Sequence, residues 1–284
     1  MAGAIKNALM TVFKGLWIGG TLTVPGVSGG SMAMILGIYD KLLWAVNSIL
    51  KKGGERKKAL IFLLWMLIGG GVGFIVFSKL IGFLLEIAPL FVCFFFVGAV
   101  VGGIPMVIKQ AGIEKFSLLD GLMVAIGIIV VWLISLIPSG LFSIDGIGGV
   151  GGVSLKMLCG VILAFGLVLP GISFSQMLYV FGIYGEIVDR VSSFDILPLL
   201  PFGVGGIIGI FATSRLVEAM MKRFPRRVYM VIFGFLLGSA PTMFKNQSFD
   251  GISWWACLIF ILLAAAGFAS VYPMTLAEDG KAKE

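Results

Sequence analysis

Two short segments of this sequence carry the residue types best suited to binding a charged ligand: PGVSGG at 25–30 and PGIS at 170–173. In each of them a proline removes a backbone N–H donor and disfavours helix in the residue before it. We expect a helix to begin again at about 28–31 and at about 173–176, with a serine as its N-cap. The first backbone N–H groups of such a helix have no partner inside it and attract anions. The two segments therefore predict two anion sites.

The candidate anion ligands are the small and hydroxyl-bearing residues of these segments. Gly29 and Gly30 would let a phosphate approach the backbone closely, because glycine has no side chain in the way. The full set comprises Gly26, Ser28, Gly29, Gly30 and Ser31 in the first segment, and Gly171, Ser173, Ser175 and Gln176 in the second. For either segment alone, an ordinary proline–glycine kink with the serine bonded back to its own helix is the simpler interpretation. Two related copies favour the anion sites.

The surrounding sequence is typical of a helical protein that crosses a membrane several times. Only 12% of the 284 residues are charged and 59% are hydrophobic, with a mean hydropathy of +1.11, whereas soluble domains average about 25% charged residues. Apolar stretches occur at 5–24, 31–50, 59–78, 88–108, 121–138, 155–169, 176–190, 198–221, 228–244 and 254–273. A membrane span needs about 20 apolar residues. The stretches on either side of 170–173 are shorter than this, which favours a broken hairpin that re-enters the membrane.

The two halves of the chain are related copies. A shift of 145 residues aligns 25–43 with 170–188, and 7 of the 19 positions are identical. A shift of 136 residues aligns 69–105 with 205–241, and ten of the 37 positions are identical. Seven of these ten are glycine or proline. Apolar composition alone does not bring so many glycines and prolines into register, so we interpret the pattern as an internal duplication.

The charges predict that the two copies have opposite orientations in the membrane. Residues 51–58 hold five basic side chains and one acidic one, whereas their counterpart at 185–197 is mainly acidic. The next pair is reversed, because 222–227 is basic and the counterpart segment 79–91 has one charge of each sign. By the positive-inside rule, 51–58 and 222–227 face the cytoplasm. Inverted-topology repeats of this kind are typical of secondary transporters.

These observations together predict an all-α polytopic membrane protein built from two inverted-topology repeats. Each repeat consists of a broken, re-entrant helix hairpin followed by two spans. The first repeat covers 1–108 and the second covers 155–244. Residues 109–154 provide a linking span, and 245–284 provide a C-terminal span and tail. Both termini are expected on the cytoplasmic side.

The residue types that are missing exclude several kinds of chemistry. The chain has no histidine, so a Ser-His-Asp or Cys-His nucleophile and a histidine metal ligand are excluded. Its three cysteines, Cys93, Cys159 and Cys257, each lie in an apolar run and predict neither a disulfide framework nor a zinc site. We therefore predict no catalytic residue, no metal and no cofactor. The net charge of +7 is assigned to cytoplasmic loops, not to nucleic-acid binding. An enzyme acting on a lipid phosphate is a further alternative, although no acidic cluster supports it.

Four charged residues lie close to the predicted spans. Lys79 and Arg215 occupy equivalent positions of the repeat, in the shared pattern G-x4-S-[KR]-L. Their side chains could pair with an anionic headgroup, or simply extend to the membrane interface. Glu86 and Glu218 lie one or two turns further on. Either carboxylate is a candidate carrier of a coupling proton, with a surface position as the alternative.

The doubled motif resembles the bacterial polyprenyl-phosphate transporter family over essentially the whole chain. The resemblance is carried by PGVSGGS followed by LGIY in the first half and by LPGIS-x-S in the second. It implies that the motif residues contact a lipid phosphate: Pro25, Gly26, Ser28, Gly29, Gly30 and Ser31, with Pro170, Gly171, Ser173 and Ser175. In the second half Phe174 stands at the position of Gly29, and Gln176 at that of Ser31. The second site is therefore expected to approach phosphate less closely, or to use Phe174 to contact the isoprenyl chain.

The same resemblance implies a flippase-like carrier in the cell inner (cytoplasmic) membrane. Such a carrier would return undecaprenyl phosphate from the outer to the cytoplasmic leaflet for reuse in cell-envelope synthesis. Its partners would be the polyprenyl-phosphate lipid and the surrounding membrane lipids. A carrier or channel for a small inorganic anion, using the same helix ends, is the alternative function.

Overall fold

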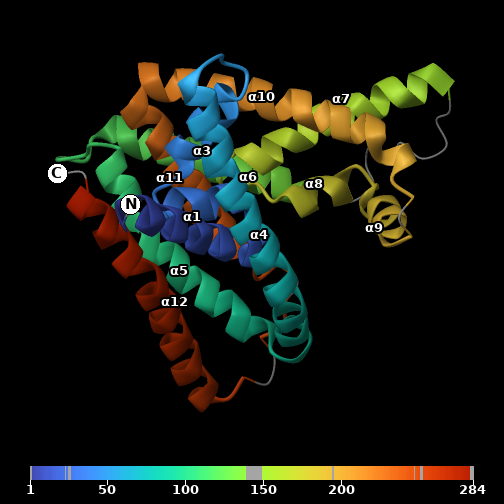
Figure 1. Cartoon of the computed structure of the whole chain (residues 1–284). Coiled ribbons are helices and arrows are strands. Elements are labelled where there is room, and N and C mark those ends of the chain that lie inside the picture. Colours follow the sequence, from blue (N-terminus) through green and yellow to red (C-terminus); the bar gives the residue numbers. More distant parts are fainter. Residues whose placement is uncertain are drawn as a thin grey trace.

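The computed structural model describes residues 2–22, 24, 27–138, 149–193, 195–245, 247–249 and 252–281. Of the described residues, 83% are in helices and none lies in a strand. The helices of the first half are α1 (Ala2–Thr21), α2 (Gly29–Ile35), α3 (Tyr39–Ser48), α4 (Gly54–Ile87), α5 (Pro89–Gln110) and α6 (Leu118–Leu136). Those of the second half are α7 (Gly149–Val168), α8 (Phe174–Val180), α9 (Tyr184–Ser192), α10 (Leu200–Arg223), α11 (Pro225–Thr242) and α12 (Trp254–Lys281), with a short 3-10 turn at Leu197–Leu199. Figure 1 shows their arrangement.

Within the described residues, six helical segments are long and apolar enough to cross a membrane. They are Gly54–Ile87, Pro89–Gln110, Leu118–Leu136, Gly151–Val168, Leu197–Arg223 and Trp254–Pro273. Six spans were also expected from the sequence, but one of the six segments is a different helix. The expectation that 155–169 is too short to span was wrong, because the helix begins at Gly149. α11 is not among the six, and its first turn carries Arg226 and Arg227.

Glycines set the distance between α1 and α4, which run parallel to each other. A Cβ atom on Gly69 would lie 2.1 Å from the carbonyl oxygen of Val12, and one on Gly73 would lie 2.1 Å from that of Leu16. Carbon and oxygen atoms do not approach this closely, so only glycine permits the contact. Residue numbers rise together along both helices, so α1 and α4 begin on the same side of the bundle.

The same contact recurs between α7 and α10. A Cβ atom on Gly205 would lie 2.0 Å from the carbonyl oxygen of Met157, and one on Gly209 would lie 2.6 Å from that of Val161. These two glycines follow those of α4 by 136 residues, and their two partners follow those of α1 by 145 residues. The glycines that recur in the sequence therefore lie at matching helix interfaces.

Each half of the chain also contributes a helix to the other half. The last helix, α12, runs beside α5 (Figure 1), where a Cβ atom on Gly98 would lie 1.9 Å from the carbonyl oxygen of Ala264. The linking helix α6 packs in the same way on α11, where a Cβ atom on Gly234 would lie 2.2 Å from the carbonyl oxygen of Val124. This exchange fastens the two halves to each other at two equivalent places.

Each broken hairpin contains an additional turn that the apolar pattern did not predict. The stretch at 31–50 was expected to be continuous, but α2 and α3 are separated at Gly37, which has a φ of 68°. α8 and α9 are separated in the same way at Gly182, with a φ of 67°. Glycine adopts this left-handed conformation without steric cost. The recurring Gly-Ile-Tyr therefore marks a turn followed by a new helix.

The two hairpins differ in how deeply they are buried. α2 lies in the main hydrophobic core, where Met32, Met34 and Ile35 are wholly buried. α8 instead contributes Leu178 to a separate, smaller cluster. In Figure 1, α1 and α3 lie in the middle of the molecule, whereas α8 and α9 lie at its edge.

A polar contact joins the two halves where α3 ends. The side-chain amide of Asn47 donates a hydrogen bond to the carboxylate of Glu218. Asn47 lies at the end of α3, shortly before α4 begins, and Glu218 lies in the last turns of α10. The start of α4 and the end of α10 are therefore on the same side of the molecule, together with the basic segments 51–58 and 222–227.

Candidate functional site

The break between α1 and α2 ends in a capped helix start. Ser28 has an extended backbone, and its hydroxyl accepts a hydrogen bond from the backbone N–H of Ser31 at 3.0 Å. The two serine hydroxyls lie 2.8 Å apart, and both residues are buried, with exposed fractions of 4% and 3%. The prediction that a helix begins here with a serine cap is confirmed. The connection from α1 to α2, together with the first turn of α2 (Gly29–Ser31), is called the first break below.

The second break, residues 169–173, meets the first in the interior of the protein. The backbone N–H of Gly171 donates to the hydroxyl of Ser31 at 2.6 Å and to that of Ser28 at 3.0 Å. Gly171 has a φ of 80°, and a Cβ atom on it would lie 2.6 Å from Phe235 of α11, so only glycine fits. We call Ser28, Ser31 and Gly171 the break cluster. It brings together two segments that are about half the chain apart.

Two further contacts hold the breaks against each other. A Cβ atom on Gly30 would lie 3.1 Å from the carbonyl oxygen of Val168 and 3.1 Å from the nitrogen of Pro170, so the backbones nearly touch. The hydroxyl of Tyr39 donates to the carbonyl oxygen of Val168 at 3.0 Å. This carbonyl belongs to the last turn of α7, where the helix itself supplies no donor. The first hairpin therefore provides hydrogen-bond partners for backbone groups that have none within the second hairpin.

The remaining break residues have different environments. Pro25 and Gly26 lie outside the described residues, as do the side chains of Ser175 and Gln176. Ser173, the counterpart of Ser28, is buried directly before α8. Phe174 is the first residue of α8, and 37% of it is exposed. The prediction that helix resumes at about 173–176 is confirmed.

The charged residues singled out from the sequence lie apart from the buried break cluster. Lys79 on α4 and Arg215 on α10 are both exposed, as is Glu86 near the end of α4. Glu218 is only partly exposed, and it accepts hydrogen bonds from Asn47 and, at 2.5 Å, from the ammonium of Lys222. Glu218 thus connects α10 to α3.

A carboxylate in the second hairpin is held in its charged form by two cations. The ammonium of Lys156 and the guanidinium of Arg190 each lie 3.0 Å from Glu186. Burial acts to raise the pKa of the Glu186 carboxyl, but the two cations outweigh it and keep the pKa below its ordinary value. This ion-paired group anchors α9 to α7.

Lys14 is a candidate functional residue that the sequence reasoning missed. It lies in α1 and is only 2% exposed, and its ammonium donates to the carbonyl oxygen of Leu36, at the end of α2, at 2.7 Å. A buried cation is costly and, at membrane depth, usually functional. The sequence contained two signs that Lys14 is unusual. It lies in the middle of the apolar stretch 5–24, and the equivalent position of the second copy is Cys159.

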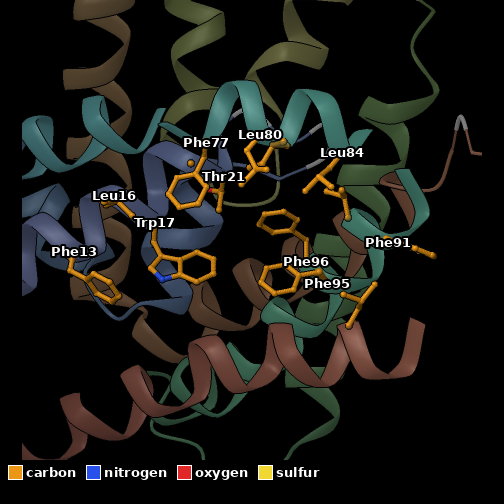
Figure 2. Close-up of a pocket in the computed structure, with 14 residues that line it drawn as sticks. Phe13, Leu16, Trp17, Thr21, Phe77, Leu80, Leu84, Phe91, Phe95 and Phe96 are labelled. Carbon is orange, nitrogen blue, oxygen red and sulfur yellow. The ribbon is translucent and has the colours of Figure 1, made fainter. Parts of the chain in front are cut away.

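A large apolar cavity adjoins the first break. Its volume is about 480 Å³, and it lies between α1, α4 and α5, with one contact from α12. Thr21, the last residue of α1, is part of its wall (Figure 2). A second cavity of about 420 Å³ lies between α7 and α10 and includes Phe174. Over the described part of the chain, no group of three metal-ligating side chains occurs.

This geometry defines a multi-pass helical membrane protein whose two helix breaks meet in one buried polar cluster. The chain belongs to the VCA0040-like family, described as undecaprenyl phosphate translocase-like, whose profile matches residues 18–254. The family is named for transport, not for a chemical reaction.

Two relatives cover most of the chain. One is a polyprenyl-phosphate transporter of Vibrio cholerae, 30% identical over 269 residues that make up 89% of this chain and 82% of the relative. Another is a polyprenyl-phosphate transporter of Staphylococcus aureus, 27% identical over 267 residues, or 89% of this chain and 92% of the relative. No solved structure matches the chain.

Proposed function

We propose that this protein carries polyprenyl phosphate across a membrane and binds its phosphate where the two helix breaks meet. The observation that carries the proposal is the break cluster, in which the Gly171 N–H group and the hydroxyls of Ser28 and Ser31 converge at one buried point. Hydroxyl and backbone N–H donors at a helix start are the groups that bind phosphate without altering it. The family relation supports the same class of substrate.

The break cluster in this structure is closed, because its donors and acceptors satisfy one another. A phosphate bound there would take the place of the contacts between Ser28, Ser31 and Gly171, and the two hairpins would move apart to admit it. An unsatisfied buried polar group costs about 1–3 kcal/mol. Without phosphate, the closed contacts satisfy these groups, so the closed state is favoured. With phosphate bound, the phosphate satisfies them, so the state with separated hairpins is favoured. This exchange of partners is a two-state element of the kind a carrier needs.

Re-entrant hairpins and inverted repeats are part of the proposal. α1 ends at Thr21 alongside the middle of α4, which continues to Ile87, and the chain then returns to the side on which α1 and α4 begin. The Asn47–Glu218 contact supports opposite directions for α4 and its counterpart α10. The basic segments 51–58 and 222–227 lie on one side, which we assign to the cytoplasm together with both termini.

The finer assignment is to undecaprenyl phosphate in the bacterial cytoplasmic membrane. The protein would return this lipid from the outer to the cytoplasmic leaflet, where it is reused for cell-envelope synthesis. The description of the family as undecaprenyl phosphate translocase-like supports this choice of lipid. Chemically, the protein binds and releases a phosphate monoester and leaves it unchanged.

Proton coupling is assigned to Glu218 in preference to Glu86. Glu218 is partly buried and bonded to both Asn47 and Lys222, so gain of a proton there would loosen α10 from α3, whereas Glu86 is exposed. Glu218→Gln should therefore remove any dependence of transport on a pH gradient while binding of polyprenyl phosphate persists. Retention of the full gradient dependence by this variant would contradict the assignment.

The function is tested with the purified protein in proteoliposomes that contain undecaprenyl phosphate. We expect the protein to move the lipid phosphate between leaflets and to take up no radiolabelled inorganic phosphate. Uptake of the inorganic ion with no movement of the lipid would instead favour an inorganic-anion carrier. Hydrolysis of the lipid phosphate would favour an enzyme.

A further inference from the structure

The apolar cavity beside the first break is lined largely by aromatic rings. Figure 2 shows that these rings come from α1, α4 and α5 and surround one space. The aromatic residues are Phe13, Trp17, Phe77, Phe91, Phe95 and Phe96. The rings of Trp17 and Phe95 are parallel, with centroids 6.4 Å apart, and Phe95 meets Phe96 edge to face at 5.4 Å. At about 480 Å³, the cavity is within the range of about 300–1,000 Å³ that is common for small-molecule sites.

The wall of this cavity is almost entirely apolar. Thr21 and Trp17 carry the polar side-chain groups among the residues that line it, and the hydroxyl of Thr21 donates back to the carbonyl oxygen of Ile18 at 2.8 Å. A ligand here must therefore be mainly apolar. Phe13 and Leu80 are about half exposed, so the cavity opens from the region in which membrane lipid would lie.

The position of the cavity relates it to the break cluster. Thr21 ends α1, and the first break, which contains Ser28, follows it in the chain. One amphiphilic molecule could therefore place a polar head at the break and the first part of its chain in the cavity. The rest of a long chain would remain in the bilayer, because the cavity holds only a short portion of it.

We propose that this aromatic cavity binds the isoprenoid units next to the phosphate of a polyprenyl phosphate, and that its rings favour an isoprenoid over a saturated alkyl chain. The inference rests on the proposed function and specifies how that function selects its lipid. Isoprenoid chains carry methyl branches and double bonds that fill an irregular, ring-lined space, whereas a saturated chain is thin and straight. Aromatic rings are large and rigid, so a branched chain that fits between their faces and edges makes more van der Waals contacts than a thin straight one.

The cavity that includes Phe174 is the alternative binding site for the isoprenoid chain. It adjoins the second break and, at about 420 Å³, is almost as large. Its wall is mainly aliphatic, with Phe174 and Phe202 as its two aromatic residues, and the break beside it begins α8 with a bulky side chain. The aromatic lining and the small residues of the first break both favour the cavity between α1, α4 and α5.

The first test uses the unaltered protein and farnesyl phosphate with a photoreactive diazirine on its chain. Covalent labelling is mapped by mass spectrometry, in the presence of either farnesyl phosphate or pentadecyl phosphate as competitor. We expect labels on α1, α4 and α5, and farnesyl phosphate should compete about 3- to 10-fold better than the alkyl phosphate, which has the same head and carbon count.

The second test uses two cavity variants and one control. Leu84→Trp fills the cavity, and Phe95→Leu removes a ring while keeping an apolar side chain. Both should weaken farnesyl phosphate binding by about tenfold, whereas Ile207→Trp in the cavity of Phe174 should leave it within about twofold. Because Phe95→Leu is a mild change, it remains informative if Leu84→Trp fails to fold.

Three results would overturn the inference. Labels confined to the cavity of Phe174 would show that the isoprenoid chain binds beside the second hairpin. Equal competition by the alkyl phosphate would remove the proposed selectivity. Both of these results leave polyprenyl-phosphate transport standing, because the protein still binds the lipid. The third result would contradict the proposed function itself. In that case the unaltered protein shows no saturable labelling and does not move undecaprenyl phosphate in proteoliposomes.

Discussion

The two broken hairpins of this protein have related sequences but different surroundings. In the first, α2 is buried in the main core, and its capping serines bond to the other hairpin. In the second, α8 packs in a small separate cluster near the edge of the molecule, and Phe174 at its start is partly exposed. The first hairpin supplies hydroxyl groups and small residues, whereas the second supplies the Gly171 N–H group. The two related hairpins thus meet in one break cluster to which they contribute unequally, and we propose this cluster as the phosphate site.

A second difference concerns charge. Lys14 in α1 is a buried cation, and the equivalent position in α7 is Cys159, which is also buried. The charge of Lys14 is directed at the end of α2, where its carbonyl partner lies. The first hairpin therefore holds a buried positive charge at the opposite end of α2 from Ser28, where the second hairpin has a neutral thiol. Under the proposed function, the phosphate would therefore meet a different environment in each hairpin.

The largest effect is expected from Gly171→Ala, which tests how tightly the second break is packed against α11. The new Cβ atom would strike Phe235 and would also sit at a positive φ, so we expect a loss of about 3 kcal/mol or more of stability. Gly112→Ala is the matched control, because its φ is 65° and nothing lies within 4 Å of the new atom. Thermal unfolding should show a far smaller loss for the control. Equal losses would mean that close packing of Gly171 against Phe235 contributes nothing to stability.

The next effect concerns the serine caps. The double variant Ser28→Ala/Ser31→Ala removes both acceptors of the Gly171 N–H group, and it should lower transport about tenfold or more, because the phosphate loses its hydroxyl donors as well. Ser173→Ala in the second hairpin should lower transport only about two- to threefold. Transport of undecaprenyl phosphate in proteoliposomes at equal protein content measures both. Similar losses for the two variants would show that the breaks act as equals.

The duplication, the helix starts and the packing faces could be predicted from the sequence, because each leaves a local mark. The glycines at 69, 73, 205 and 209 recur in register, and they lie at the α1–α4 and α7–α10 interfaces. The meeting of the breaks and the exchange of α6 and α12 could not be predicted, because both depend on contacts between residues far apart in the sequence. The turns at Gly37 and Gly182 were missed because apolar periodicity continues across them.

Lys14→Met sharpens the difference in charge between the hairpins. Replacing a buried cation with an apolar side chain of similar length should leave stability within about 1 kcal/mol or raise it. Transport should fall about tenfold, because the first hairpin loses the buried positive charge that would attract a phosphate into the protein interior. Cys159→Ser at the equivalent position of α7 should change transport by less than about twofold. A transport assay combined with thermal unfolding separates the two effects. Full transport by Lys14→Met would assign Lys14 a purely structural role.

The smallest effect is expected from changing the size of the first side chain of α2 and of α8. Gly29→Ala adds a Cβ atom 3.0 Å from the flexible end of Leu22 and narrows the approach to the backbone, which should lower transport about threefold. Phe174→Ala opens the equivalent place in the second hairpin and should change transport by less than about twofold. Initial rates in proteoliposomes would show the contrast. A larger loss from Phe174→Ala would make the second hairpin the main phosphate site.

The most direct test of the central claim is a reversible cross-link between the breaks. The claim is that the two breaks meet in the empty carrier and separate to bind phosphate. Gly30→Cys and Leu169→Cys place two thiols at this contact, because a Cβ atom on Gly30 would lie 3.3 Å from the carbonyl carbon of Leu169. The pair is introduced into a protein whose Cys93, Cys159 and Cys257 have been replaced, and movement of undecaprenyl phosphate is measured with and without oxidant. Oxidation should stop transport, a reductant should restore it, and undecaprenyl phosphate should slow formation of the disulfide. Undiminished transport by the fully cross-linked protein would contradict the account.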